Sequence, residues 1–529
     1  MREKRLKENR TKKRTNFETG ILATLILLIF RIPLARTIGD EANGYLAISW
    51  EIYSLFYLLF GFGYSEAVSI MVKNRIERGL YRNGVKSMST VLLAGFFSAA
   101  AGALLLYAVS TPLAGFFPGE KMVEISLKAF APLILCSAIL GIYRGYFEGM
   151  GSRVPTNISR LVEAVVTATG SLLFVFIARG YGEKVGALLH DSHFASGFAA
   201  AGVVAGYLCG SILSFLFLGL VYILYKTGYN RLLKKDPTRV AEARGGLIRE
   251  LTGILPTIIF PILFLRLYRF ANLWIYKGQL STEEEILKGI GIIGSFYGKI
   301  TVLMSLAIVL ILLICGGGKK RNKKQLMQNE FRTGKQILTE ELQKLFLLAF
   351  PIAGSYISLS EVLLKTIFKT ASQNDCRLFM VAGGSVIFIS LGVYLYRLLI
   401  SLQLKKQVVI VQAVAFIFQL VFMLFIVKLP TVGNLSFSAL SLGVAEMMFW
   451  IVFCLGQLFI LLKGYRLRLP WGNLVFLPLI RTLVMVVVQI LVVNLLKATI
   501  PSWIICILGI GMGIVFYQLA GRVSLFHKV

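Results

Sequence analysis

The 529-residue sequence has few charged residues and no long polar segment. Only 16% of its residues are Asp, Glu, Lys or Arg, whereas 57% are hydrophobic and the mean hydropathy is +0.75. Because no stretch combines mixed composition with the length of a domain, we expect no separate soluble domain. The apolar residues instead form runs of about 20 or more, the length that an α-helix needs to cross a bilayer. The sequence therefore predicts an all-α, polytopic membrane protein.

Cysteines and histidines are too scarce for a disulfide framework or a metal centre. Five of the six cysteines fall within or at the ends of apolar runs, Cys376 being the exception. His190 and His193 share one short external loop without thiolates, so we expect no metal there. The stretch GGGKKRNKK (316–324) lacks the GxxxxGK[ST] spacing of a phosphate-binding loop. We accordingly predict no catalytic residue, no metal and no cofactor.

Acidic residues are also scarce, and the basic excess predicts the topology. The chain has 56 Lys and Arg but 26 Asp and Glu, a formal net charge of +30. The N-terminus and every second loop together hold 36 of the basic residues, against about eight in the opposite loops. The positive-inside rule therefore predicts that both termini are cytoplasmic. The charge is then a signal of topology and of lipid headgroups, and no nucleic-acid partner is expected.

The spacing of the apolar runs predicts about fourteen spans, in two six-helix lobes followed by two C-terminal helices. The N-terminal segment is predicted to be a basic tail, because the run after it is long and lacks the cleavage pattern of a signal peptide. The predicted order is a cytoplasmic tail (1–16), an N-lobe (17–226), a basic linker (227–246), a C-lobe (247–464) with a basic cytoplasmic loop (319–341), and two helices with a short tail (465–529).

Two local patterns predict helix packing and pairing. Gly202, Gly206 and Gly210 recur every four residues, which places them on one helical face and allows a neighbouring helix to approach closely. Glu361 and Lys365 are four residues apart in an apolar run and are predicted to form an ion pair. Both patterns are expected to be structural.

Five of the basic residues inside predicted spans lie in spans one, seven and eight, and an Arg or Lys near a span centre costs about 2.5–3.5 kcal/mol on insertion scales. They are Arg31, Arg36, Arg266, Arg269 and Lys299. Counting along spans one, seven and eight places all five between the midplane and the outer leaflet. If these spans surround one cavity, it is cationic and suits an anion such as a diphosphate, with which Arg forms forked contacts. The alternative is that each cation pairs with a local carboxylate, such as Glu51 in span two, or reaches an interface.

The stretch YRGYFEGMGSRVPTNISRLVE (143–163) is a polar turn between two apolar runs. The Gly149-Met150-Gly151 run is predicted to end one helix, and Pro155 to fix the first turn of the next. Thr156 or Asn157 is the predicted cap of that second helix. The predicted result is a tight, rigid cytoplasmic corner.

Charged residues in the same stretch lie at the predicted membrane edge. Arg144 and Arg153 are expected to meet anionic headgroups. Arg160 and Glu163, three residues apart, are predicted to pair on one helical face.

This stretch also resembles the signature of the prokaryotic polysaccharide transporter family of the MATE-like flippase superfamily. The residues that carry the signature turn are Arg144, Gly145, Gly149, Pro155, Thr156 and Glu163. Residues 31–79 resemble the opening of that family, and GSFYGKITVLM (294–304) resembles a later part. Arg160 stands where the family usually has Gln, and GGGKKRNKK replaces the Pro-containing end of its helix eight.

The resemblance implies a flippase that moves an undecaprenyl-diphosphate-linked oligosaccharide or peptidoglycan precursor across the bacterial cytoplasmic membrane for cell-envelope polysaccharide biosynthesis. Two six-helix lobes would alternate about a cationic cavity, and the last two helices would accommodate the lipid tail. The family draws its cavity arginines largely from helices one, two, seven and eight, and the five cations named above lie on three of those. The implied partners are the lipid-linked sugar, anionic membrane lipids and cell-envelope glycan-synthesis enzymes. Coupling to the membrane potential or to H+ or Na+ is expected without assigned residues.

Three other functions stay open. A MATE-type, cation-coupled drug antiporter would favour embedded carboxylates for its cationic substrates, whereas the excess here is basic. A membrane-embedded glycosyltransferase or polymerase tends to carry a long external loop or an acidic cytoplasmic motif, and neither occurs, so we predict that the protein is not an enzyme. A non-transporting scaffold that gathers cell-envelope enzymes at its basic loops is the third.

Overall fold

The computed structural model describes residues 2–233, 236, 242–315, 331–427, 437–464, 469–497 and 499–526. Within these ranges the chain is helical and contains no strand. The predicted linker at 227–246 and loop at 319–341 lie partly outside them, as does all of GGGKKRNKK (316–324). The backbone of the predicted tail is helical and continuous with the first helix.

Twelve of the described helices are long and apolar enough to cross a membrane. Lys335–Ser358 and Ser360–Phe368, bent by 82° at their junction, together make a thirteenth. The first stretch, Gly20–Ile76, has 57 residues, about three times the length that one crossing requires. Gly39 interrupts it with non-helical angles of φ 80° and ψ 174°. Counted as two spans, this stretch brings the total to the predicted fourteen, and the predicted fold class is confirmed.

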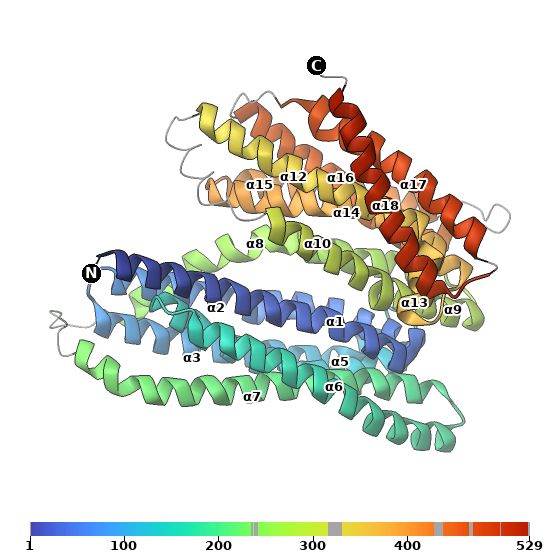
Figure 1. The fold of residues 1–529 in the computed structure, drawn as a ribbon. Coiled ribbons are helices and arrows are strands. Elements are labelled where there is room, and N and C mark those ends of the chain that lie inside the picture. The colour runs from blue at the N-terminus through green and yellow to red at the C-terminus, as the bar shows by residue number, and fades with distance from the viewer. Residues whose placement is uncertain are drawn as a thin grey trace. The chain divides into compact units, whose positions relative to one another are not determined.

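Contacts divide the chain into two compact units, of which the first is Met1–Phe270 (Figure 1). Its elements are α1 (Arg2–Tyr57), the π-helix η1 (Leu58–Phe62), α2 (Gly63–Ile76), α3 (Tyr81–Ala108), α4 (Ser110–Ala114), α5 (Glu120–Gly149), α6 (Val154–Leu189), α7 (His193–Leu233) and most of α8 (Arg244–Lys277). The helix α7 packs along α6 and α5, and α5 also packs against α2 and α3.

The second unit is Ala271–Val529. Beyond the end of α8, its elements are α9 (Glu283–Ser295), the π-helix η2 (Phe296–Ile300), α10 (Thr301–Cys315), α12 (Phe331–Ser358), α13 (Ser360–Phe368), α14 (Gln373–Ser401), α15 (Lys405–Val427), α16 (Phe437–Gly464), the π-helix η4 (Gly472–Phe476), α17 (Leu477–Leu496) and α18 (Ser502–Phe526). Here α14 packs against α12 and α16, and α17 packs against α12 and α18.

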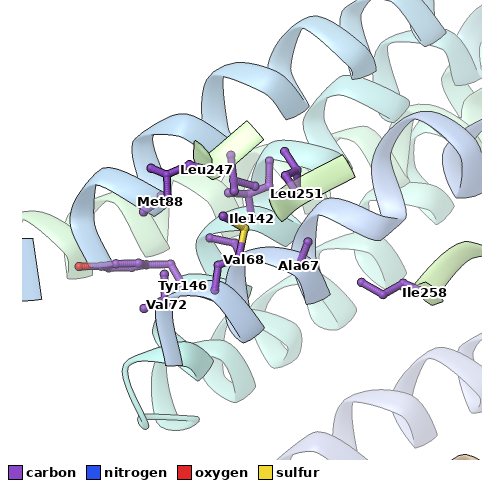
Figure 2. Close-up of a cluster of buried hydrophobic side chains, with 11 residues drawn as sticks. Ala67, Val68, Val72, Met88, Ile142, Tyr146, Leu247, Leu251 and Ile258 are labelled. Carbon is purple, nitrogen blue, oxygen red and sulfur yellow. The ribbon is translucent and has the colours of Figure 1, made fainter. Parts of the chain in front are cut away.

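The boundary between the units falls inside α8, later than the predicted linker. Figure 2 shows the reason: Leu247, Leu251 and Ile258 of α8 lie in a buried apolar cluster with residues of α2, α3 and α5, such as Val68 and Ile142. Burial of these side chains attaches the first part of α8 to the first unit. The predicted lobes themselves stay a prediction.

Two irregularities recur in the same order along the chain when α8 is counted as the first span of the second half. The second span of each half contains a five-residue π-helix, η1 or η2. The third span of each half breaks near its end, at Val109 (φ −94°, ψ 7°) or Leu359 (φ −105°, ψ 16°), and a short helix follows. These shared features favour an internal repeat, in which the two predicted six-helix lobes have the same plan. The repeat is not obvious in the sequence.

The close contact predicted from the spaced glycines is confirmed on α7. A Cβ on Gly206 would lie 2.3 Å from the backbone nitrogen of Ser171, and one on Gly210 would lie 2.1 Å from Thr167 Oγ1. Both partners are on α6. A side chain at these positions would push the two helices apart.

Candidate functional site

The five predicted cavity cations differ in their partners. Arg31 of α1 and Arg266 of α8 are partly buried, and neither has a hydrogen-bond or ion-pair partner among the residues that the structure describes. Arg36 is exposed on α1. An unpaired guanidinium inside a span must face water or another polar group, since lipid cannot solvate it. Arg31 and Arg266 are therefore the two cations most available to a ligand.

Arg269 already has a counter-charge. Its Nη1 lies 3.8 Å from Oε1 of Glu51, a carboxylate only 1% exposed, and its Nε donates a hydrogen bond to the hydroxyl of Tyr268 at 3.0 Å. A carboxylate buried this deeply requires a nearby positive charge. Local pairing, the alternative raised from the sequence, thus describes Arg269 in this conformation.

Lys299 lies within the π-helix η2, all five residues of which are buried. It is 3% exposed, and its Nζ donates a hydrogen bond of 3.0 Å to Thr370 Oγ1, just beyond α13. Insertions of this kind in helices are frequent at functional sites, because they turn a side chain away from the regular face. Lys299 is in the second unit and the four arginines are in the first, so a cavity shared by all five stays a prediction.

The signature turn is a hydrogen-bonded corner between α5 and α6. Arg144 forms an ion pair with Glu163 at 2.8 Å, and its Nε and Nη2 donate to Ser159 Oγ at 3.0 and 2.7 Å. The hydroxyl of Thr156 donates to the Arg144 carbonyl at 3.1 Å. One arginine of α5 is thus tied to three residues of α6, which makes the corner rigid, as predicted.

Three details of the predicted turn are wrong. Arg144 faces Glu163 and not the headgroups, since its side chain is only 13% exposed. Arg160 pairs with Glu148 of α5 at 3.5 Å and not with Glu163, whose carboxylate pairs with Arg144. Neither Thr156 nor Asn157 caps α6, which begins at Val154 without a side-chain cap.

Other details of the turn are confirmed. The helix α5 ends at Gly149, and Gly151 has a φ of 86°, a conformation that glycine adopts at little cost. Pro155 lies in the first turn of α6. Gly145 also allows a close approach, since a Cβ there would lie 2.0 Å from the carbonyl oxygen of Ser65 on α2.

The loop that contains His190 and His193 makes local contacts with α1. His193 Nδ1 lies 2.7 Å from Glu41 Oε1, and Ser196 donates to the other oxygen of Glu41 at 3.0 Å. In the described part of the chain, no group of three His, Cys, Asp or Glu residues could hold a metal ion. The loop therefore joins the start of α7 to α1.

Sequence reasoning missed an ion-pair cluster at the C-terminal end of α2. Arg75, 8% exposed, donates to Glu242 Oε1 at 3.1 Å, to Glu250 Oε2 at 2.7 Å and to the Met71 carbonyl at 3.1 Å. In the same place, the backbone N–H of Glu242 donates to Asn83 Oδ1 at 3.0 Å. The cluster ties the start of α8 to α2 and α3. No sequence signal links Arg75 to residues this far along the chain.

Sequence reasoning also missed Glu66 on α2. This carboxylate is exposed on the face opposite the buried Ala67 and Val68, and it has no hydrogen-bond or ion-pair partner within the described ranges. It lies in the apolar run GFGYSEAVSIMV, so the rule that singled out the arginines would have found it.

The fold is that of a multi-pass membrane protein. The structure superposes on the lipid II flippase MurJ in an inward closed conformation with a TM-score of 0.66 and 14% identity, covering 96% of this chain and 98% of that one. It superposes on an inward-facing multidrug resistance MATE family transporter of the MOP superfamily with a TM-score of 0.62 and 11% identity, covering 84% and 95%. Identities this low show a common fold.

The sequence comparisons are more specific for the first half. Residues 17–235 match the family model described as "Polysaccharide biosynthesis protein", which confirms the resemblance seen in the signature turn. Stage V sporulation protein B of Bacillus subtilis (strain 168) is 24% identical over 209 residues, 39% of this chain and 38% of that protein. The uncharacterized membrane protein YabM of the same organism is 22% identical over 392 residues, 71% of this chain and 66% of that protein. The matches thus span less than two thirds of either relative.

Proposed function

We propose that the protein is a flippase that translocates an undecaprenyl-diphosphate-linked oligosaccharide or peptidoglycan precursor to the outer leaflet of the bacterial cytoplasmic membrane, for cell-envelope polysaccharide biosynthesis. Both termini would be cytoplasmic. The observation that carries the proposal is the pair of membrane-embedded arginines, Arg31 and Arg266, which have no partner among the residues that the structure describes. The family match over residues 17–235 and the shared transporter fold support it.

A diphosphate ligand would explain why arginines occur inside the membrane despite the free-energy cost of inserting them. A guanidinium presents a planar fork of N–H donors that matches two phosphate oxygens, and such charge-assisted bonds are stronger than neutral ones. In our proposal Arg31 and Arg266 contact the diphosphate directly. Arg36, Arg269 and Lys299 would add positive potential, with Arg269 held by Glu51 until the ligand arrives.

Transport would require no bond to form or break. Binding of the anion would stabilise one orientation of the two lobes, and release on the outer side would allow the other. The membrane potential could reset a cationic site, because each charge that crosses 100 mV gains about 2.3 kcal/mol. Basic cytoplasmic segments, such as residues 1–16, would contact anionic headgroups and glycan-synthesis enzymes at the membrane surface.

The test is flipping of a fluorescent undecaprenyl-diphosphate sugar in proteoliposomes. Losing one charged hydrogen-bonding group costs about 1.5–3 kcal/mol, so Arg31→Ala and Arg266→Ala should each slow flipping by about 10-fold or more. The matched control is Arg249→Ala, an exposed arginine at the cytoplasmic start of the same helix α8, which should keep the wild-type rate. Full activity in both cavity variants would overturn the proposed role of these arginines.

Glu66 favours one second candidate, a MATE-type cation-coupled antiporter for drugs. An unpaired carboxylate in a span suits an organic cation or a coupling ion. The two functions separate in one assay: an antiporter would bind a cationic dye in a manner abolished by Glu66→Gln and unaffected by Arg266→Ala.

A further inference from the structure

The last two helices, α17 and α18, contact the chain on both sides of the break in the third span of the second half. This span, α12–α13, bends by 82° at Leu359. On the α12 side of the break, Ser358 Oγ donates to Gln489 Oε1 of α17 at 2.6 Å. Gln489 Nε2 in turn donates to Ser355 Oγ at 3.1 Å and to the carbonyl of Gly509 on α18 at 3.2 Å. One amide, 1% exposed, therefore joins three helices beside the break.

Two further contacts act at the break itself and beyond it. Leu359 is fully buried, and a Cβ on Gly509 would lie 3.0 Å from its side chain, so the break residue fits closely against α18. Glu361 of α13 pairs with Lys497, at the end of α17, at 2.6 Å, and with Lys365 at the same distance, the pair predicted from the sequence. The pair α17–α18 thus fixes both arms of the bent span.

The corresponding break in the first half is held by local contacts. Ser110 Oγ donates to the Tyr107 carbonyl at 2.8 Å, and Thr111 donates to Glu124 of the next helix at 2.8 Å. The helices α17 and α18 lie beyond the twelve spans of the repeat, so their hold on the second break is an addition to the common plan.

The held arm leads directly to a candidate site residue. The helix α13 ends at Phe368, and Thr370 two residues later accepts the hydrogen bond of Lys299. The position of Thr370 depends on the direction of α13, and that direction is set by the bend at Leu359. A chain of contacts therefore runs from Gln489 through Ser355 and Ser358 to α13, and from there to Lys299.

We propose that Gln489 is a positioning residue for Lys299. Through the hydroxyls of Ser355 and Ser358 it fixes the angle of α12–α13, and the Glu361–Lys497 pair is the second tether. Lys299 is thereby held where it adds positive potential for an anionic lipid headgroup. This proposal rests on the proposed flippase function, to which it adds a role for α17 and α18.

Removing the amide of Gln489 should loosen the bend between α12 and α13. Without Gln489, Ser358 and Ser355 lose a buried partner inside the membrane, where no water replaces it, and Ser358 keeps only its bond to the Gly354 carbonyl. The variant Gln489→Met has similar length and no hydrogen-bonding group. The matched control is Val487→Met on the same helix, whose side chain is 57% exposed and lies away from the break.

A native thiol reports on α13 independently of transport. Cys376, at the start of α14, is 9% exposed, and α14 packs against α13. All six cysteines lie within candidate spans, and Cys376 is close to the start of its own. The variant Cys376→Ser therefore gives the blank that separates labelling of this thiol by a membrane-impermeant maleimide from labelling of the other five. Release of α13 should uncover this thiol.

The experiment measures the labelling rate of Cys376 and the flipping rate of an undecaprenyl-diphosphate sugar in the same proteoliposomes. We expect Gln489→Met to raise labelling and lower flipping, each by about fivefold or more, the factor that one net hydrogen bond is worth. Val487→Met should change neither. Because Gln489 acts through Lys299, adding Gln489→Met to Lys299→Met should lower flipping no further than Lys299→Met does alone.

Several results would overturn the proposal. Unchanged labelling in Gln489→Met would show that α17 does not hold the break. Faster labelling with wild-type flipping, or additive losses in the double variant, would show that the break does not position Lys299. A failure of the proposed function would be seen separately, as absence of flipping by the wild-type protein, and the labelling rates would then still decide whether α17 and α18 hold α13.

Discussion

Replacing Gly145 by alanine tests the packing of the signature turn. A Cβ at this position would lie 2.0 Å from the carbonyl oxygen of Ser65 and 2.6 Å from a methyl group of Val68. The closest neighbour is a backbone atom in the first turn of α2, so no side-chain rotation can relieve the overlap. The end of α5 would have to move away from α2 by about 1 Å or more, in a corner that Arg144 fixes to α6.

The expected cost follows from these contacts. Overpacking a well-packed interior costs about 1–3 kcal/mol, and backbone contact places Gly145→Ala at the upper end. The intrinsic preference of alanine for helices returns about 1 kcal/mol at most, so a net loss of about 2 kcal/mol remains. At roughly 2 °C per kcal/mol for a large domain, the apparent melting temperature should fall by about 4 °C.

The assay is thermal unfolding of the purified protein in mild detergent, with Gly219→Ala as the control. Gly219 lies in α7, and a Cβ there would meet no atom within 4 Å, so its replacement should be neutral or slightly stabilising. If Gly145→Ala melts together with the wild type and the control, the close approach of α5 to α2 is not a feature of the folded protein.

Three further predictions concern stability and use the same assay. Arg75→Ala leaves two carboxylates facing each other and should cost about 2–4 kcal/mol, whereas Glu242→Gln, whose carboxylate is 38% exposed, should cost under about 1 kcal/mol; equal losses would contradict the cluster. Arg144→Glu should destabilise the corner, and adding Glu163→Arg should recover part of the loss, so that additive effects would argue against the pair. Gly206→Leu should destabilise at least as much as Gly145→Ala, and normal stability would mean that α6 and α7 do not touch there.

Patterns confined to one helix predicted the structure well. The apolar runs predicted the helical membrane fold, because their length depends on the bilayer rather than on tertiary contacts. The spaced glycines on α7, the helix end at Gly149 and the position of Pro155 were also predicted correctly. Each of these follows from the geometry of a single helix or its terminus.

The partners that polar side chains find on other helices could not be predicted from the sequence. Glu163 was matched with Arg160, three residues away, whereas the fold presents Arg144 of the preceding helix. The angle at a corner decides such a pairing, and no periodicity encodes it. The partners of Arg75 lie 167 and 175 residues along the chain, and the embedded Gln489 gives no sign of the break that it holds.

The embedded cations show what the cost of inserting a charge into the membrane can and cannot predict. Insertion cost drew attention to five cations, and the structure leaves two of them, Arg31 and Arg266, without a described partner. Glu51 was named as a possible partner, but the sequence could not show that it balances Arg269 or that Lys299 lies in a π-helix. Those outcomes depend on which helices meet, so only the structure separates available from occupied charges.

The most direct test of the account is mass spectrometry of the lipids that copurify with the protein in mild detergent. Wild type should carry an undecaprenyl-diphosphate sugar, Arg249→Ala should retain it, and Arg266→Ala should lose it. Such a result would also identify the glycan. If only bulk phospholipid accompanied all three proteins, the proposed recognition of a lipid diphosphate by the embedded arginines would be contradicted.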